Sequence, residues 1–477
     1  MKAAAIFQSG LVFQRGKPVL IWGTGTPGER IQGTIQGRSA ETAADADGTW
    51  TLRIPALRES ICETLTLEGN CHVKIDDVAV GEVFVAAGQS NMEFWMRYEK
   101  HYPEILPVCE NPNIRFFDLP KRYYPGQEYD FDYRNAGIWR KASQQDLQYF
   151  SAVGYYLARK LEKDLSIPVG IIGCSWGGTR SQAWMTADHA RSIQKIGKRA
   201  WDPWNPMNEF LLPGTPSADE IQAFLRENSV EPSKPENTPG ALYRNMVQSL
   251  APYTVRAVLW YQGESDDETD GAQKNYRAAL DAIKEDWRCA WEESDLPFFV
   301  VQLPGFSSWF GLVNKGYPII RVCQQESVDA DSHAYLCSVS DAGEEFDIHP
   351  KNKMVVGERL ALLAEKHLFG MDILADAPRP GDVRWDGNTI TVFFEYAEGG
   401  LLVDGEEINA LSVVQEKREI AYTAEICGSS LVIRIPPAVS GELTVKFACE
   451  AWYRVNLYNQ AHIPAVPFAA KVQRKEK

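Results

Sequence analysis

Three residues that stand far apart in this chain could together perform nucleophilic catalysis. Ser90 comes shortly after the apolar run 83–87, so the serine is expected where a strand ends, the place at which open α/β sheets bind ligands. Asp347 and His349 stand two residues apart far downstream. A serine hydroxyl needs a base to take its proton, and an aspartate fixes the tautomer of that base. The pattern predicts a serine hydrolase with Ser90 as nucleophile, His349 as base and Asp347 as orienting acid.

Each of these residues also has a structural interpretation that the sequence leaves open. Ser90 would serve as the N-cap of a following helix, with Glu93 as its capping-box partner. Asp347 would act as a turn residue or N-cap before Pro350, and His349 is expected to open the helix that follows and ends near Gly370. What favours the catalytic interpretation is that the Asp–His pair lies at the end of the α/β region.

Two further segments each follow a predicted strand and offer hydrogen-bond donors. Gly177 and Gly178 form a glycine loop in which backbone N–H groups can approach a ligand closely, or simply a tight turn. Gln262 follows the predicted strand 257–261 and could donate its amide to a developing oxyanion, or hydrogen-bond within an ordinary loop. Glu264, two residues on, is expected to brace that loop or to contact substrate.

The pattern of elements divides the chain into three predicted domains. Residues 1–78 show period-two patterning with Gly, Pro and Asp turns, which indicates a small β-sandwich-like domain. Residues 79–372 alternate strands with helices, including a helix near 151–165 and one near 276–287, which predicts a mostly parallel sheet covered on both faces. Residues 373–477 return to strands and predict a second β-domain.

Composition excludes several function classes. A formal charge of −15 argues against nucleic acid and anionic membranes as partners. Nine cysteines with no Cys-x-x-Cys pattern indicate reduced thiols, and no signal peptide or membrane span is recognised, so a cytoplasmic location is expected. The oligomeric state stays open, a homodimer included.

Four blocks of this sequence resemble the sialate O-acetylesterases, a carbohydrate-esterase branch of the SGNH (GDSL-like) hydrolases. The blocks are Gly88-Gln89-Ser90-Asn91-Met92-Glu93, Ser175-Trp176-Gly177-Gly178-Thr179, Trp260-Tyr261-Gln262-Gly263-Glu264-Ser265 and Asp347-Ile348-His349-Pro350-Lys351. Both flanks are also similar to the family, for example 11–15 and 456–468. The chain departs from the family pattern at Asp266, where Asn is common, and at Ser181-Gln182, where an Ile-Glu pair is common.

The resemblance implies an SGNH-type doubly wound sheet and a Ser-His-Asp esterase that needs no metal and no cofactor. It implies an oxyanion hole made from the Ser90 backbone N–H, Gly177 or Gly178, and the Gln262 side chain. The substrate it implies is an O-acetylated sugar, most notably sialic acid. Because the two departures lie beside the expected pocket, they bear on substrate preference more than on reaction type.

Aromatic and arginine residues of the long loops are candidates for contacting the sugar. Arg97 or Arg180 could pair with a sialate carboxylate through a bidentate contact. The aromatic candidates are Trp95, Tyr98, Trp201 and Trp204. Packing within the loops is the alternative for each of them.

Three rival functions stay open on the sequence alone. The first is an esterase for acetylxylan or another polysaccharide, which would use the same catalytic residues. The second is a non-catalytic carbohydrate-binding protein. The third is a glycosidase that uses paired carboxylates such as Glu264 and Asp347, but it would leave Ser90 and His349 without a role.

Overall fold

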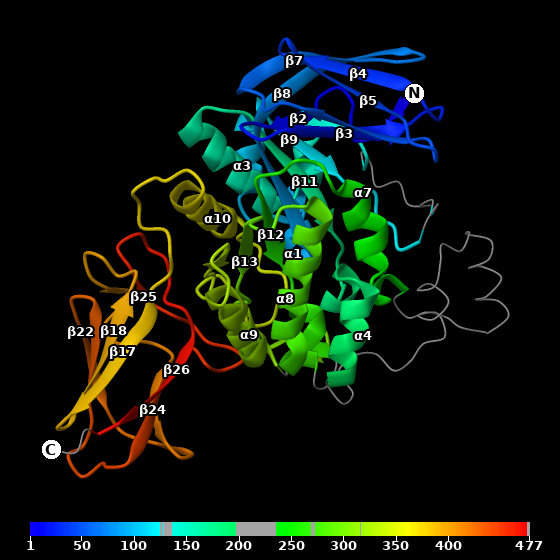
Figure 1. The fold of residues 1–477 in the computed structure, drawn as a ribbon. Helices are drawn as coiled ribbons and strands as arrows, with labels where there is room; N and C mark the ends of the chain where they lie inside the picture. Colours follow the sequence, from blue (N-terminus) through cyan, green and yellow to red (C-terminus); the bar gives the residue numbers. More distant parts are fainter. Residues whose placement is uncertain (125–126, 128–135, 197–234, 269–271, 315, 475–477) are drawn as a thin grey trace. The chain divides into compact units, whose positions relative to one another are not determined.

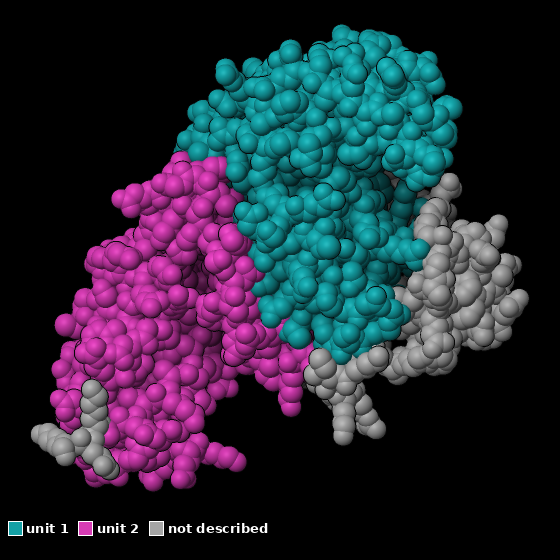
Figure 2. Space-filling model, in the orientation of Figure 1, with its two compact units in different colours: residues 1–262, 278–298 teal, residues 263–277, 299–477 magenta. Residues whose placement is uncertain are grey.

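A computed structural model describes residues 1–124, 127, 136–196, 235–268, 272–314 and 316–474 of the chain (Figure 1). The chain divides into two compact units, which Figure 2 shows in different colours. Unit 1 comprises residues 1–262 and 278–298, and unit 2 comprises residues 263–277 and 299–477. The predicted division at 78/79 and 372/373 stays a prediction, and its first boundary falls inside strand β8 (His72–Gly88).

The N-terminal part of unit 1 is built from short strands, as the period-two patterning predicts. These strands are β1 (Lys2–Ala3), β2 (Val12–Gln14), β3 (Val19–Thr24), β4 (Arg30–Ile35), β5 (Arg38–Ala43), β6 (Thr49–Ile54) and β7 (Ser60–Glu68). Strand β6 alternates exposed and buried residues and pairs antiparallel with β3. Strand β7 pairs antiparallel with the first half of β8, so one continuous strand leads from this β-rich region into the central sheet.

The central sheet of unit 1 has β8 in its middle. Its strand order is β10 (Trp139–Ala142), β9 (Asn111–Asp118), β11 (Val169–Ser175), β8 and β12 (Ala257–Tyr261). Strand β11 runs parallel to both β9 and β8, and β12 runs parallel to β8, whereas β10 is antiparallel to β9. Every residue of β12 is buried, as expected for a parallel strand with both faces covered.

The helices of unit 1 are α1 (Ser90–Glu93), α2 (Tyr102–Ile105), α3 (Ala152–Leu165), α4 (Ala187–Ile196), α7 (Gln248–Leu250) and most of α8 (Ala272–Trp291). Helices α1, α3 and α8 of unit 1 contact this sheet. Gly154 lets α3 approach the sheet, because an added Cβ would lie 2.9 Å from Ile171 of β11. Trp260 of β12 makes edge contacts with Trp184 and with Trp287 of α8, at centroid distances of 6.2 and 6.0 Å.

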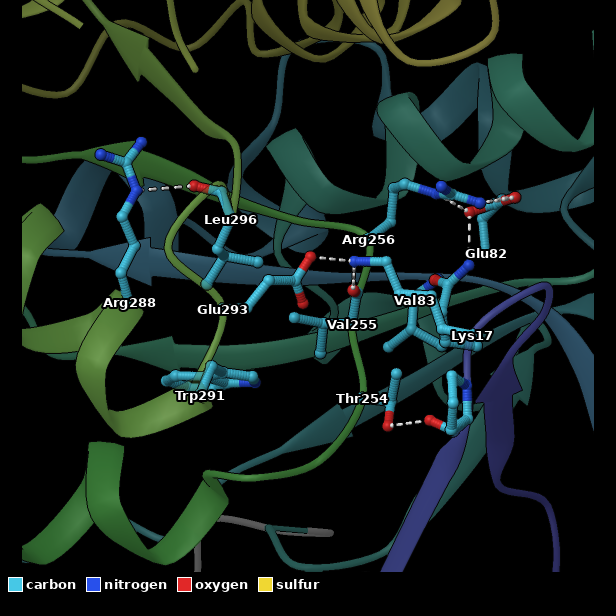
Figure 3. A network of polar contacts seen from close by, with 12 residues as sticks. Lys17, Glu82, Val83, Thr254, Val255, Arg256, Arg288, Trp291, Glu293 and Leu296 are labelled. Atoms are coloured by element: carbon cyan, nitrogen blue, oxygen red, sulfur yellow. Dashed lines mark hydrogen bonds and ion pairs between the residues drawn. The ribbon is translucent and has the colours of Figure 1, made fainter. Parts of the chain in front are cut away.

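A buried carboxylate anchors β8 at the point where it enters the central sheet. Glu82 is fully buried and accepts hydrogen bonds from Gln14, from Arg15 Nε at 2.7 Å and from Arg256 Nε at 2.6 Å. Figure 3 shows this pair of Arg256 and Glu82 close to Lys17, which contacts the Val255 carbonyl and the Glu293 carboxylate. Charge neutralisation by two arginines is what allows a carboxylate to be buried here.

Unit 2 contains a helical part and a β-rich part. The helical part holds α9 (Tyr317–Asp329), α10 (Met354–His367), β16 (Ala334–Cys337) and the hairpin of β14 (Ser308–Trp309) and β15 (Leu312–Val313). Strand β13 (Phe298–Val301) begins at the last residue of unit 1 and neighbours β16 in sheet order.

The β-rich part of unit 2 consists of two four-stranded sheets and a two-stranded one. One sheet has the order β17 (Arg379–Asp386), β18 (Thr389–Glu395), β23 (Ser430–Arg434) and β22 (Thr423–Cys427). The other has the order β21 (Arg418–Glu419), β20 (Leu411–Gln415), β24 (Glu442–Phe447) and β26 (Phe468–Gln473). The small sheet pairs β19 (Leu402–Val403) with β25 (Leu457–Tyr458). Residues of both larger sheets, such as Trp385 and Val445, share one apolar core, as the sequence predicts for a second β-domain.

Candidate active site

Ser90 lies directly beyond the carboxyl end of β8, where the sequence pattern places it. The strand ends at Gly88, whose φ of +130° is strained for any other residue and whose added Cβ would lie 2.1 Å from the Tyr261 carbonyl oxygen. Ser90 is the first residue of the short helix α1. The N-cap of that helix is Gln89, so the alternative interpretation of Ser90 as N-cap is wrong.

The glycine loop that follows β11 lies beside Ser90. Ser175 of β11 pairs with Gly88, so the two strands end at the same level of the sheet. An added Cβ at Gly177 would lie 3.2 Å from the Cβ of Ser90, which makes glycine the residue that allows this approach. The Gly177 backbone N–H donates to Glu93 Oε2 at 2.8 Å, and Lys121 Nζ lies 2.5 Å from the other oxygen of Glu93.

The Glu93 carboxylate therefore links the Gly177 loop to Lys121, a contact that the sequence does not predict. Glu93 had been interpreted as the capping-box partner of Ser90, but its carboxylate binds the Gly177 loop instead. No local sequence pattern signals the contribution of Lys121, because it comes from another part of the chain.

Gln262 connects the ends of three neighbouring strands. It follows β12, is fully buried, and its Nε2 donates to the Thr179 carbonyl at 3.1 Å and to Gln89 Oε1 at 3.2 Å. Gln89 in turn donates its backbone N–H to Tyr261 at 3.0 Å. The Gln262 side chain thus makes hydrogen bonds to the loops that follow β8 and β11. The oxyanion roles of Ser90, Gly178, Gly177 and Gln262 stay predictions, and in this structure the Gly177 N–H and the Gln262 amide are engaged with protein acceptors.

The candidate substrate-contacting residues of unit 1 lie in two loops. Arg97 stacks on aromatic rings, with its Cζ 4.5 Å from the Trp95 centroid, 4.7 Å from that of Tyr98 and 5.2 Å from that of Tyr149. Its Nη2 donates to the Tyr98 hydroxyl at 2.7 Å. Arg180 is buried, and its backbone N–H donates to Asn237. Trp201 and Trp204 lie outside the described residues.

Asp347 and His349 lie in unit 2, in the segment that precedes α10. Asp347 Oδ1 accepts the backbone N–H of His349 at 2.8 Å, whereas the ring Nδ1 of His349 lies 3.9 Å from that oxygen, beyond hydrogen-bonding distance. Lys351 Nζ contacts the other oxygen at 2.9 Å. The ring of His349 makes an edge contact with Trp309 at a centroid distance of 5.2 Å. Asp347 therefore stabilises the turn that carries His349, but its carboxylate makes no hydrogen bond to the His349 ring.

His349 does not open the helix that follows it, so that expectation is wrong. Helix α10 begins at Met354 and its C-cap is Leu368, although Gly370 does adopt the positive φ expected near a helix end. The physical reason is a turn in which Lys353 donates its backbone N–H to the Lys351 carbonyl before the helix begins.

The electrostatic surroundings of His349 keep its imidazole neutral. Burial and, to a smaller extent, the nearby Lys353 ammonium together lower the pKa of His349 to about 4, although the Asp347 carboxylate partly opposes the shift. Lys353 is fully buried, and burial lowers its pKa to about 7 despite the opposing charge of Glu264. A neutral imidazole is the form that can accept a proton from a serine hydroxyl. Among the described residues there is no group of three or more His, Cys, Asp or Glu side chains that could hold a metal ion.

Comparison with known proteins relates the whole chain to carbohydrate esterases. Residues 211–362 match the family model described as carbohydrate esterase, sialic acid-specific acetylesterase. The sialate O-acetylesterase of Rattus norvegicus is 24% identical over 96% of this chain and 91% of its own length. The human sialate O-acetylesterase is 26% identical over 79% of this chain and 73% of its own length.

A solved structure extends this likeness to the fold. The crystal structure of a carbohydrate acetylesterase from Xanthomonas citri matches with a TM-score of 0.81 at 26% identity, covering 98% of this chain and 99% of that chain. The chain is similar to the sialate O-acetylesterases. The resemblance predicted from four sequence blocks is thereby confirmed, as is the predicted enzyme class, a carboxylic ester hydrolase.

The positions where this chain departs from the family pattern are buried. Asp266 and Ser181 are fully buried, and Gln182 is 1% exposed and donates its side-chain amide to the Asn237 carbonyl at 2.6 Å. Glu264, the first residue of the 3-10 turn that contains Asp266, is also buried. In this sialate O-acetylesterase relative, these positions therefore act through packing and hydrogen bonds.

Proposed function

We propose that this protein hydrolyses O-acetyl esters of sugars by a Ser-His-Asp mechanism. Ser90 attacks the acetyl carbonyl, His349 takes the serine proton, and Asp347 orients the imidazole. His349 then gives its proton to the departing sugar oxygen, which leaves as a hydroxyl, and water repeats the cycle to release acetate. The oxyanion is held by the backbone N–H of Ser90 and by Gly177, Gly178 or Gln262.

The observation that carries this proposal is the arrangement at the carboxyl ends of β8, β11 and β12. Ser90 follows the first strand, Gly177 of the second loop lies against it, and Gln262 of the third bonds the other two loops. Such an arrangement supports a serine presented on rigid elements rather than on a mobile loop. The lowered pKa of His349 keeps the imidazole neutral at neutral pH, which is the protonation state that a general base needs.

The fold that we propose is the doubly wound SGNH type. The parallel pairs of β8 with β11 and β12 support it, as does the packing of α3 and α8 against the sheet. We also propose a cytoplasmic location, which nine free cysteines support. No described helix has the length and apolar character that a membrane span requires.

The sugar that we propose is sialic acid, because the matching family model and the rat and human relatives carry that substrate in their names. Acetylated xylan or another polysaccharide is the rival substrate class, because the same residues would serve it. Acetate release should therefore be compared on 9-O-acetylated N-acetylneuraminic acid and on acetylated xylooligosaccharides.

The outcome separates all the functions considered. Faster acetate release from the sialic acid ester supports the proposed substrate, and faster release from the xylooligosaccharides replaces it with the polysaccharide. Release of free sugar units without acetate would indicate a glycosidase. Absence of any turnover on both substrates would contradict the proposed activity.

A further inference from the structure

A cavity in unit 2 lies directly beside the segment that carries the proposed base. Its volume is about 630 Å³, within the range of roughly 300–1,000 Å³ that small-molecule sites occupy. It is lined by two segments, 340–347, which ends two residues before His349, and 452–455 of the β-rich part. All the residues that line it belong to unit 2.

The walls of this cavity are held together by hydrogen bonds, so it is formed before a ligand arrives. Arg359 makes a bidentate contact with Asp341 at 2.6 and 2.8 Å. Ser340 donates to the Ala465 carbonyl at 3.0 Å. Gly343 packs so closely that an added Cβ would lie 2.3 Å from the Gly305 carbonyl oxygen. A preformed site loses little conformational entropy when it binds a ligand.

Aromatic side chains offer apolar faces in this cavity. Trp452 is partly exposed, and Phe346 is exposed over 67% of its surface, which is unusual for a phenylalanine without a binding partner. The Arg454 guanidinium lies 5.9 Å from the Trp452 ring centroid. The faces of such rings match the apolar C–H faces of a pyranose ring.

A buried hydroxyl in the wall also lacks a protein partner. Tyr453 is 6% exposed, and its hydroxyl makes no hydrogen bond to any part of the chain that the structure describes. Buried tyrosine hydroxyls normally have a partner, because an unsatisfied one costs free energy. This oxygen has almost no accessible surface, so a ligand in the cavity does not reach it.

The charges of the cavity indicate which ligands it accepts. Asp341, Glu344, Glu345 and Asp347 line it, with Arg454 as the single cationic side chain of the lining. Arg359 neutralises Asp341 and Lys351 contacts Asp347, but the Glu345 carboxylate has no hydrogen-bond or ion-pair partner within the described ranges, whereas its backbone carbonyl accepts from Ser307 and Ser308. Carboxylates accept hydrogen bonds from hydroxyls and repel anions.

We propose that this cavity is a binding site for neutral, hydroxyl-rich sugar units of the glycan that carries the acetyl group. Trp452 stacks on a pyranose, the Glu345 carboxylate accepts hydrogen bonds from its hydroxyls, and the carboxylates exclude anionic sugars. The inference rests on the proposed function for the identity of the glycan, but the binding itself requires no turnover.

The test measures binding of unacetylated sugars to the full-length chain by isothermal titration calorimetry. The probes are lactose, cellohexaose and xylohexaose as neutral sugars and N-acetylneuraminic acid as the anionic one. At least one neutral probe should bind, and Trp452→Ala should leave the binding of N-acetylneuraminic acid unchanged, because the proposed active site accommodates that sugar. Trp452→Ala should weaken the neutral sugar about 10-fold, and Glu345→Gln should weaken it about threefold.

A matched control comes from an aromatic residue that does not line the cavity. Phe393→Ala, on β18 of the same β-rich part, should leave the affinity unchanged. If Trp452→Ala does not fold, Glu345→Gln alone decides the test, because it removes the charge and keeps the size of the side chain. The proposal is overturned if no neutral probe binds, if neither variant weakens binding of the neutral sugar, or if Trp452→Ala weakens the anionic sugar as much as the neutral one. Failure of the esterase function would instead show as a lack of acetate release in the separate turnover assay.

Discussion

The pH dependence of catalysis should reveal the unusual environment of His349. An ordinary histidine has a pKa of 6.5, but burial and the charge of Lys353 lower the pKa of His349 to about 4. A general base works only when it is neutral. Because the pKa is lowered, the imidazole stays neutral as the pH falls through 6.5 and gains its proton only near pH 4. Activity should therefore persist on the acid side.

The size of this effect follows from the two pKa values. At pH 5.5, an imidazole with a pKa of 6.5 is about 10% neutral, whereas one with a pKa of about 4 is about 97% neutral. The neutral fraction of the imidazole at pH 5.5 therefore differs about tenfold between the two pKa values. Holding the imidazole in its neutral form should thus keep kcat/KM at pH 5.5 within about 10% of its value at pH 7.5.

The assay is kcat/KM for 4-nitrophenyl acetate from pH 3.5 to 8, since this parameter reports the pKa of the free enzyme. Tryptophan fluorescence at each pH verifies that the chain stays folded, and His349→Ala supplies the background rate. The acid limb should be centred near pH 4. A limb centred at pH 6.5, with a tenfold loss at pH 5.5 in folded protein, would falsify the account of how burial tunes this base.

Three further predictions concern stability and catalysis. Glu82→Gln should lower the free energy of unfolding in urea by about 3–5 kcal/mol, because two arginines lose a buried partner. The control Asp382→Asn, which breaks an exposed ion pair, should cost less than ~1 kcal/mol. Equal losses in the two variants would refute the role of burial. Gly88→Ala should strongly lower the melting temperature, because the added Cβ would lie 2.1 Å from a carbonyl oxygen. The control Gly387→Ala should lower it much less, because its added Cβ would have no atom within 4 Å. An unchanged melting temperature for Gly88→Ala would contradict the close approach. Gln262→Ala should lower kcat about 100- to 1,000-fold if its amide binds the oxyanion; a change in stability with unchanged kcat would limit the residue to bonding the loops.

The sequence predicts the strand ends that carry the candidate site because their signals are local. Short, mostly apolar runs predict β8, β11 and β12, and the structure confirms all three strands. The helical stripe near 151–165 likewise predicts α3, which spans Ala152–Leu165. These elements follow from hydrophobic periodicity and turn chemistry, which need no knowledge of distant residues.

Helix α9 was not predicted, because polar residues occupy its buried face. Arg321, Gln324 and Ser327 are almost fully buried and break the apolar stripe. Their partners come from elsewhere in unit 2, since Gln324 accepts the Leu303 backbone N–H and Arg321 donates to the Glu450 carbonyl. A helix stabilised by long-range polar contacts has no clear periodicity in its own sequence.

The finer geometry of the site also depends on contacts that no spacing reveals. The contact of Glu93 with the Gly177 loop replaced the capping box that its position suggested. The contact of Lys351 with Asp347 likewise follows from the turn rather than from the Asp-x-His pattern, and it competes for the carboxylate that the pattern assigns to the histidine ring.

The most direct test of the proposed mechanism compares two serine variants in acetate release from an O-acetylated sugar. Ser249→Ala, in α7, removes a hydroxyl that donates to the Met246 carbonyl and serves as the matched control. Ser90→Ala should lose at least ~1,000-fold in kcat while keeping the circular dichroism spectrum and melting temperature of the parent chain. Ser249→Ala should retain full activity. Unchanged acetate release by a folded Ser90→Ala variant would remove Ser90 from the chemistry and contradict the mechanism.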